Sequence, residues 1–226
     1  MSMDARPQVP PLHVALFIGS LSLLASSLAL AVPTSLNLLP TADVAGKGKY
    51  LIELEIDGRA TPFASGAQAW LLTDVGIGDR LEVGLNRVEG PGLSRWTMDS
   101  KLRLVPESER MPALAIGATD ITRRDEGATW YVLGTKGLGP VRATVGYQRD
   151  SFGRLMLGGA YNITSRLTLQ SDWTSGPGGT GTLGVCQDIG HSRCLLLYYA
   201  RSNSGNEGNF TGLNLTWNCE WRHRID

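Results

Sequence analysis

The chain has 226 residues, 28 of them glycine, and its 21 acidic and 21 basic residues leave no net charge. A balanced charge without a basic stripe argues against nucleic acid as the main partner, because nothing would follow the phosphates. The glycines show no collagen-like period and instead fit a protein with many tight turns.

The residue pattern at the N-terminus predicts an export signal. Residues 12–30 are apolar and uncharged apart from a few serines and His13, and they end in Ala29-Leu30-Ala31. Small residues in an A-x-A arrangement after an apolar stretch predict a cleaved signal peptide, here residues 1–31. The alternative is a retained helical anchor, since the stretch is nearly long enough to span a bilayer. No second long apolar run follows, so an exported chain that crosses a membrane must do so as a closed barrel.

After a loop-like lead-in over residues 32–48, apolar and polar residues alternate along the chain as far as Trp221. Period-two alternation with one apolar face is typical of half-buried strands. We predict an all-β fold, an antiparallel up-and-down transmembrane β-barrel over 49–221 with a tail at 222–226. The expected strands are 49–57, 66–74, 80–88, 95–105, 112–119, 129–135, 140–148, 153–162, 165–173, 180–188, 191–201 and 210–221.

Alternation alone also fits a secreted soluble β-sandwich that binds a ligand, but the connections favour the barrel. Odd-numbered connections such as 58–65 and 120–128 are mostly long, whereas even-numbered ones such as 163–164 and 189–190 are mostly short. Outer-membrane barrels have short periplasmic turns and longer external loops. The predicted loop at 89–94 fits this asymmetry, while the turn at 106–111 is long for its end.

The aromatic residues favour the same interpretation. Membrane barrels carry aromatic girdles at both interfaces, whereas a sandwich core would place its rings at strand middles. Trp70, near a strand middle, does not conform. The others gather near strand ends: Trp96, Trp130, Tyr147, Trp173, Tyr199 and Phe210 at the external end, and Tyr50, Tyr161, Trp217 and Trp221 at the periplasmic end.

One turn recurs, since 76–83 resembles 162–169, both with an I-x-x-R-L sequence. Together with the signal, the strands and the aromatic ends, these turns are similar to porin-like outer-membrane β-barrels of diderm bacteria. The resemblance implies outer-membrane lipid as the surroundings and the barrel-insertion machinery as a partner. Residues 37–43 also resemble the start of some barrel proteins linked to exopolysaccharide export. One departure is the C-terminus, where Trp221 is followed by five residues instead of ending the chain.

The inward-facing polar residues are the candidate site. In a water-filled lumen they would set the field felt by a passing solute. Alternatively they form a satisfied salt-bridge network that fills a narrow interior, because about twelve strands lies between packed and open barrels. The candidates are Glu53, Glu55, Glu82, Asp99, Lys101, Arg103, Arg142, Arg154, Arg166 and Asp172.

Two of the three cysteines, Cys186 and Cys194, flank a predicted turn. With a three-residue loop they would lie opposite each other in the lumen and form a cross-strand disulfide, whereas a two-residue loop would leave free thiols out of register. Export favours an oxidising compartment. Cys219 is left over, and the cysteine spacing does not suit a zinc site.

We expect no enzyme and no cofactor. Residues 176–181 match G-x-G-x-x-G by letter, but a strand follows in place of the helix that the dinucleotide fingerprint needs. His191 and His223 lie beside no serine nucleophile signature. The leading expectation is a narrow porin-like channel for small solutes in the outer membrane. The alternative is a non-conducting structural or accessory barrel, for example in polysaccharide export; the oligomeric state is open.

Overall fold

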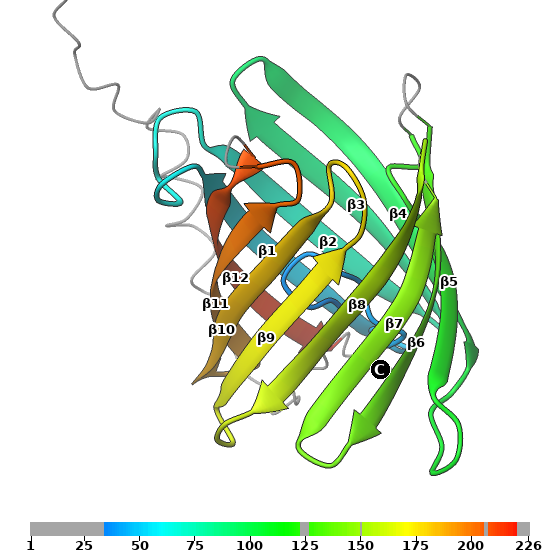
Figure 1. The fold of residues 1–226 in the computed structure, drawn as a ribbon. Coiled ribbons are helices and arrows are strands. Elements are labelled where there is room, and N and C mark those ends of the chain that lie inside the picture. The colour runs from blue at the N-terminus through cyan, green and yellow to red at the C-terminus, as the bar shows by residue number, and fades with distance from the viewer. Residues whose placement is uncertain (1–33, 123–126, 150, 206–207, 221–226) are drawn as a thin grey trace, which may run out of the picture.

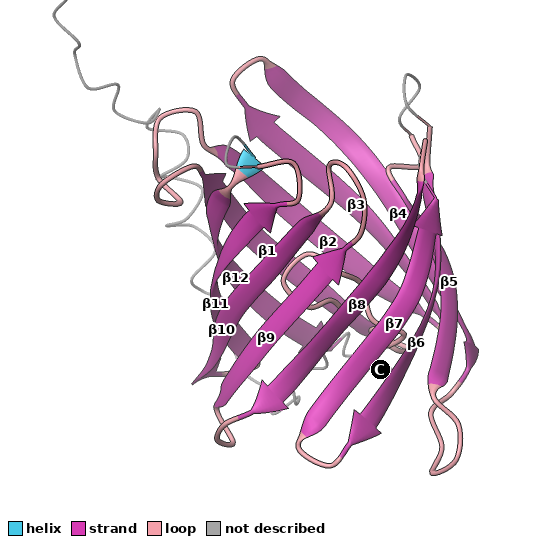
Figure 2. Ribbon diagram, in the orientation of Figure 1, coloured by secondary structure: helices cyan, strands magenta, loops and turns pink. Residues whose placement is uncertain are grey.

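The computed structural model describes residues 34–122, 127–149, 151–205 and 208–220. The predicted signal peptide 1–31, the tail 222–226 and Trp221 lie outside these residues. Twelve strands form one closed antiparallel barrel, as predicted (Figures 1 and 2). They are β1 (Lys49–Gly58), β2 (Gln68–Ile77), β3 (Leu81–Gly90), β4 (Leu93–Val105), β5 (Ala113–Thr119), β6 (Thr129–Leu138), β7 (Val141–Arg149), β8 (Gly153–Asn162), β9 (Leu167–Thr174), β10 (Thr180–Gly190), β11 (Arg193–Ser202) and β12 (Phe210–Glu220).

The barrel closes where the first strand meets the last. β1 pairs with β12 from Lys49 opposite Glu220 to Gly58 opposite Thr211, and every other strand pairs with its neighbours in sequence. Closure satisfies the hydrogen-bonding groups that an open sheet would leave along its two edges. The soluble sandwich, which needs two separate sheets, is therefore not the fold of this chain.

The outer face of the wall is apolar. On β10, Leu183 and Val185 are 56% and 41% exposed, whereas Thr182, which alternates with them, is buried. Monomeric soluble proteins rarely expose large contiguous apolar patches. The same outward exposure is shared by residues from most of the wall: Leu85, Met98, Leu102, Leu104, Ile116, Val132, Val145, Leu155, Leu157, Leu195 and Leu197.

The barrel has two different ends. At the long-loop end lie the connections that follow β1, β3, β5, β7, β9 and β11, and at the turn end lie those that follow the other strands. The predicted loop at 89–94 is wrong in length, because β3 and β4 continue to the two-residue turn Pro91-Gly92. Proline fixes its own φ and Gly92 has a φ of +71°, the combination that a tight turn favours.

Most aromatic side chains lie where the alternation predicts. Trp96, Trp130 and Tyr199 are exposed on the outer face toward the long-loop end. Phe210 is an exception, since it packs edge-on against the buried Tyr198 inside the barrel, with ring centroids 6.1 Å apart. Trp70 also faces inward, which explains why it fits neither girdle.

The lead-in does not lie outside the barrel. Residues 34–45, which we name the inner segment, lie within the lumen (blue in Figure 1). Eight of them are buried: Thr34, Leu36, Asn37, Leu39, Thr41, Ala42, Asp43 and Val44. A bridge between Ser35 and Pro40 folds the start of the segment back on itself. The sequence predicted only a loop here, because the segment carries no strand periodicity.

Candidate functional site

The inward face of the strands carries most of the candidate residues. Glu53 and Glu55 on β1, Glu82 on β3, Lys101 on β4 and Asp172 on β9 are buried. Asp99 is half-buried on the same inward face of β4. Period-two geometry brings them together, because residues two apart on one strand point to the same side of the sheet.

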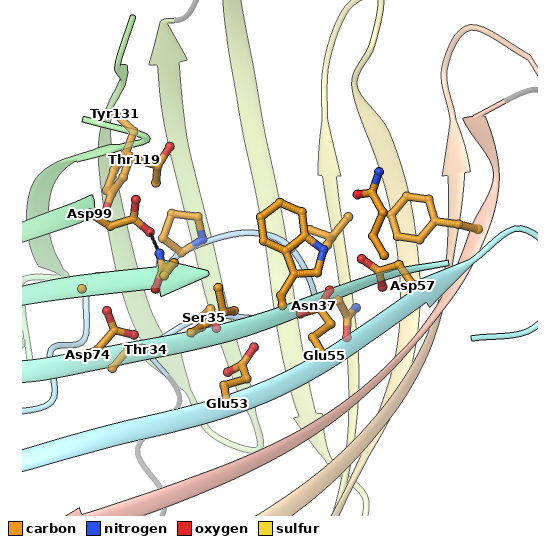
Figure 3. A pocket seen from close by; sticks show the side chains of 18 of the residues that line it. Thr34, Ser35, Asn37, Glu53, Glu55, Asp57, Asp74, Asp99, Thr119 and Tyr131 are labelled. Atoms are coloured by element: carbon orange, nitrogen blue, oxygen red, sulfur yellow. Dashed lines mark hydrogen bonds between the residues drawn. The ribbon is translucent and has the colours of Figure 1, made fainter. Parts of the chain in front are cut away.

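A cavity of about 590 Å³ lies between the inner segment and the wall formed by β1 to β4. It reaches the long-loop end at Arg59 and Asn209, and Thr34, Asn37 and Leu38 of the inner segment form its floor. Figure 3 shows the carboxylates of β1 following one another along the cavity. The acidic lining residues are Glu53, Glu55, Asp57, Asp74, Glu82 and Asp99, and the basic ones are Arg59 and Lys101.

Neutral donors hold three of these carboxylates in place. The Asn214 amide donates to Glu53 and, at 3.2 Å, to Glu55. The hydroxyl of Tyr198 lies 2.8 Å from the Asp57 Oδ1 and also contacts Glu55. These donors are uncharged, so they orient the carboxylates without adding positive charge to the β1 side of the cavity.

One buried ion pair stands at the floor of the cavity. The Lys101 Nζ lies 2.9 Å from the Glu82 Oε1, with side chains only 5% and 6% exposed. Lys101 also donates to the carbonyl oxygen of Thr34 at 3.0 Å, and Glu82 accepts the backbone N–H of Ala45 at 2.7 Å. The pair therefore binds both ends of the inner segment to β3 and β4.

Strands on other sides of the barrel hold the inner segment through hydrogen bonds to its backbone and to the Asn37 side chain. The N–H of Leu38 donates to Asp172 on β9 at 3.0 Å, and the N–H of Ala42 donates to the Thr135 hydroxyl on β6 at 2.8 Å. The Asn37 amide reaches the Thr182 hydroxyl on β10 at 2.8 Å. Buried backbone groups need such partners, and here side chains of the lumen supply them.

An apolar cluster completes the contact. Leu36, Leu39 and Ala42 of the segment pack against the wall with exposed fractions of 5%, 1% and 0%. Their partners are Ala113 and Ala115 on β5, Tyr131 and Leu133 on β6, and Met156 on β8. The inward face of this side is therefore apolar where it meets the segment, unlike the acidic side that faces the cavity.

Arg142 on β7 links the segment to the turn end. Its guanidinium forms two hydrogen bonds with Asp43, at 2.9 and 2.7 Å, and one with Glu107 at 2.8 Å. Such two-pronged arginine–carboxylate pairs are directional and stronger than neutral hydrogen bonds. The backbone N–H of Gly137, together with Arg142, holds the pKa of Glu107 below its ordinary value of 4.5. The turn at 106–112, which is long for its end of the barrel, thus places the Glu107 carboxylate against Arg142 and Gly137.

None of the four candidate arginines lines the cavity, and the three besides Arg142 lie away from the inner segment as well. Arg103 donates to the carbonyl oxygen of Asp79 at 2.6 Å, in the turn before β3. Arg154 lies against the loop at Gly178. Arg166 was predicted on a strand, but it is exposed in the turn that precedes β9. That turn is longer than expected, so the alternation begins only at Leu167.

Sequence reasoning missed several lumenal residues. Asp57 follows Glu53 and Glu55 in the same phase, so the signal was present. Asp74 and Trp70 were harder, because the inward set of β2 alternates polar Gln68 and Asp74 with apolar Trp70 and Leu72. The role of the inner segment has no local signal, since its partners come from distant strands.

A disulfide joins Cys186 and Cys194, whose Cα atoms are 6.2 Å apart. The two are not directly opposite, because Cys186 pairs with Leu196 and Cys194 with Asp188 next to a bulge. The side chain of Cys219 lies outside what the structure describes. Within the described residues, no helix has the length and apolar character needed to cross a membrane. Nor does that part of the chain gather three or more His, Cys, Asp or Glu residues able to hold a metal ion.

Comparison with solved structures supports the architecture. The KdgM porin matches with a TM-score of 0.57 at 8% identity, over 74% of this chain and 98% of the porin. The fold is porin-like. The NanC porin gives a TM-score of 0.55 at 8% identity, over 76% of this chain and 99% of the other. A KdgM porin in complex with disordered oligogalacturonate gives 0.55 at 9% identity, over 77% and 99%. No family model and no curated protein matches the sequence.

Proposed function

We propose that this protein is an outer-membrane barrel that conducts small solutes through a narrow lumen and prefers cations. Its apolar outer wall suits lipid, and a chain that crosses a bilayer with strands must close them into a barrel. The porin-like fold supports the same placement. The rival interpretation, a non-conducting accessory barrel, keeps the same wall but has no use for a cavity that reaches the long-loop end.

The acidic cavity is the observation that supports the cation preference. Six carboxylates and two basic side chains line it. Rings of carboxylates attract cations and repel anions at close quarters. Water inside a narrow barrel screens such charges less well than bulk water does, which strengthens the effect. One matching structure is a KdgM porin in complex with disordered oligogalacturonate. A cavity lined by six carboxylates would repel an anionic oligomer of that kind, so we expect a different class of solute here.

The location is tested by extraction and gel migration. The mature protein should need detergent and migrate differently when unheated and heated. Freely soluble mature protein would disprove the membrane placement, whatever the outcome of the conductance measurements.

The cation preference is tested by the reversal potential in planar bilayers under a potassium chloride gradient. The protein should favour potassium over chloride. Asp57→Asn with Asp74→Asn should shift the reversal potential toward zero, because two cavity carboxylates are lost. Glu89→Gln is the matched control, since Glu89 lies exposed on the outer face of β3. Silence of every variant, with the barrel shown to be folded, would leave the accessory interpretation.

A further inference from the structure

We propose that the inner segment is a built-in gate that closes the pore and opens by leaving its seat in the lumen. The inference rests on the proposed function, since a gate needs a pore. Thr34, Asn37 and Leu38 of the segment line the cavity, which reaches the long-loop end at Arg59 and Asn209. Eight of the segment's residues are buried, and its Asp43 pairs with Arg142, which also binds Glu107 in the turn between β4 and β5.

The inner segment is attached to strands on several sides of the barrel. Hydrogen bonds or ion pairs hold the segment to Glu82 on β3, Lys101 on β4, Thr135 on β6, Arg142 on β7 and Asp172 on β9. A segment fastened to walls on several sides blocks the passage between them. The cavity lies on the β1 to β4 side of the lumen, and Thr34, Asn37 and Leu38 of the segment line it there.

Glycines in the wall are placed where the segment needs room. A Cβ at Gly76 on β2 would lie 1.7 Å from the carbonyl oxygen of Gly46. A Cβ at Gly184 on β10 would lie 2.3 Å from the Asn37 Oδ1, and one at Gly158 on β8 would lie 2.4 Å from the Leu36 Cδ1. Three strands on different sides thus lack a side chain where the inner segment, or Gly46 directly after it, approaches. The wall is shaped around the seated segment.

Part of this attachment can nevertheless be exchanged. Three of the contacts are hydrogen bonds from backbone N–H groups of the segment, at Leu38, Ala42 and Ala45, to a hydroxyl or carboxylate of the lumen, and water can replace bonds of this kind. The segment has no paired strand with the wall, and the covalent path from it to β1 is the short stretch Gly46 to Gly48. Gly46 and Gly48 have φ values of +79° and +72°, a conformation that glycine adopts at little cost. This stretch is the natural hinge.

The test displaces the segment from two independent positions. Gly76→Ala places a Cβ against the backbone of Gly46. A backbone cannot avoid this clash by a change of side-chain rotamer, so the chain at Gly46 must move. Asp43→Asn removes the charge that pairs with Arg142. We expect both variants to raise the open probability in planar bilayers about tenfold or more, where tenfold corresponds to about 1.4 kcal/mol against the closed state. Gly159→Ala is the control, because a Cβ there meets only the Arg142 carbonyl oxygen at 3.6 Å.

A lock tests the same gate in the opposite direction. The backbone N–H of Ala42 donates to the Thr135 hydroxyl at 2.8 Å, so we expect cysteines at the two positions to lie close enough for a disulfide. In a Cys219→Ser background, the oxidised Ala42→Cys/Thr135→Cys protein should stay closed even with Gly76→Ala present, and reduction should open it. The background protein treated with the same reductant controls for the native Cys186–Cys194 bridge.

The outcomes separate the gate from the pore. If the unaltered protein conducts as well as Gly76→Ala and Asp43→Asn, or if the lock leaves the current unchanged, the gate is refuted while the pore stands. If every folded variant is silent, including the reduced ones, the proposed channel is refuted and the gate with it. A current that rises on displacement and falls on locking establishes both.

Discussion

The Lys101–Glu82 pair allows a quantitative test of how the lumen is held together. The two charged groups are 2.9 Å apart and almost fully buried. At an effective dielectric constant of 20, Coulomb's law gives a gross attraction of about 6 kcal/mol at this distance. Desolvation of both ions offsets much of that attraction, so the net value of the intact pair is small.

Removing one partner has a much larger effect than the net value of the pair. Lys101→Met leaves Glu82 as a buried charge without a cation, and breaking a buried pair in this way typically costs about 3–5 kcal/mol. It also removes the donor to Thr34. We therefore expect Lys101→Met to lower the free energy of unfolding by that amount, and Lys101→Met with Glu82→Gln to recover most of the loss.

The assay is urea unfolding of the detergent-folded or vesicle-inserted barrel, followed by tryptophan fluorescence and by heat-modifiable migration. Lys136→Met is the matched control, because its pair with Glu107 spans 3.5 Å with side chains 26% and 28% exposed. Exposed pairs are worth about 0–1 kcal/mol. A loss below about 1 kcal/mol for Lys101→Met, or a double variant whose losses simply add, would contradict this account of a buried, coupled pair.

Two further predictions concern the outer wall and the turn end. Val185→Arg, at the middle of β10 on the outer face, should destabilise the barrel in lipid by about 2–4 kcal/mol; unchanged stability in lipid vesicles would mean that this face does not meet lipid. The lowered pKa of Glu107 means that its carboxylate stabilises the fold above pH 4.5 and that this contribution is lost as the pH falls through the lowered value. Acid titration of stability should therefore be shallower below pH 4.5 in Glu107→Gln than in the unaltered protein, and identical profiles would show that Glu107 contributes nothing. Its charged neighbours, Arg142 on β7 and Lys136 on β6, are unchanged in that variant.

Local pattern was enough to predict the wall of this barrel. Residues such as Leu183 and Thr182 alternate with period two, and alternation alone decides which side of a strand a residue faces. The placement of Glu53, Glu55, Glu82 and Lys101 on the inward face follows from that rule. Errors occurred where a turn shifts the start of a strand, as at Arg166, or where two residues such as Pro91-Gly92 make a tighter turn than composition suggests.

The inner segment was beyond sequence reasoning for a physical reason. Its residues form no regular element, so no period reveals which side they present. Four of their partners, Thr135, Arg142, Asp172 and Thr182, are 93 to 145 residues away in the chain. Only closure of the barrel brings these partners around one lumen. Only then does the inner segment, or Gly46 directly after it, occupy the space that the missing side chains of Gly76, Gly158 and Gly184 leave.

The sequence by itself therefore determined a β-barrel with an apolar outside, a polar inside and two unequal ends, because those properties depend on neighbours within a strand. The tertiary structure decided what occupies the inside. It divided the lumen into an acidic cavity along β1 to β4 and an inner segment packed against the remaining wall, because that division depends on contacts between strands that meet only when the barrel is closed.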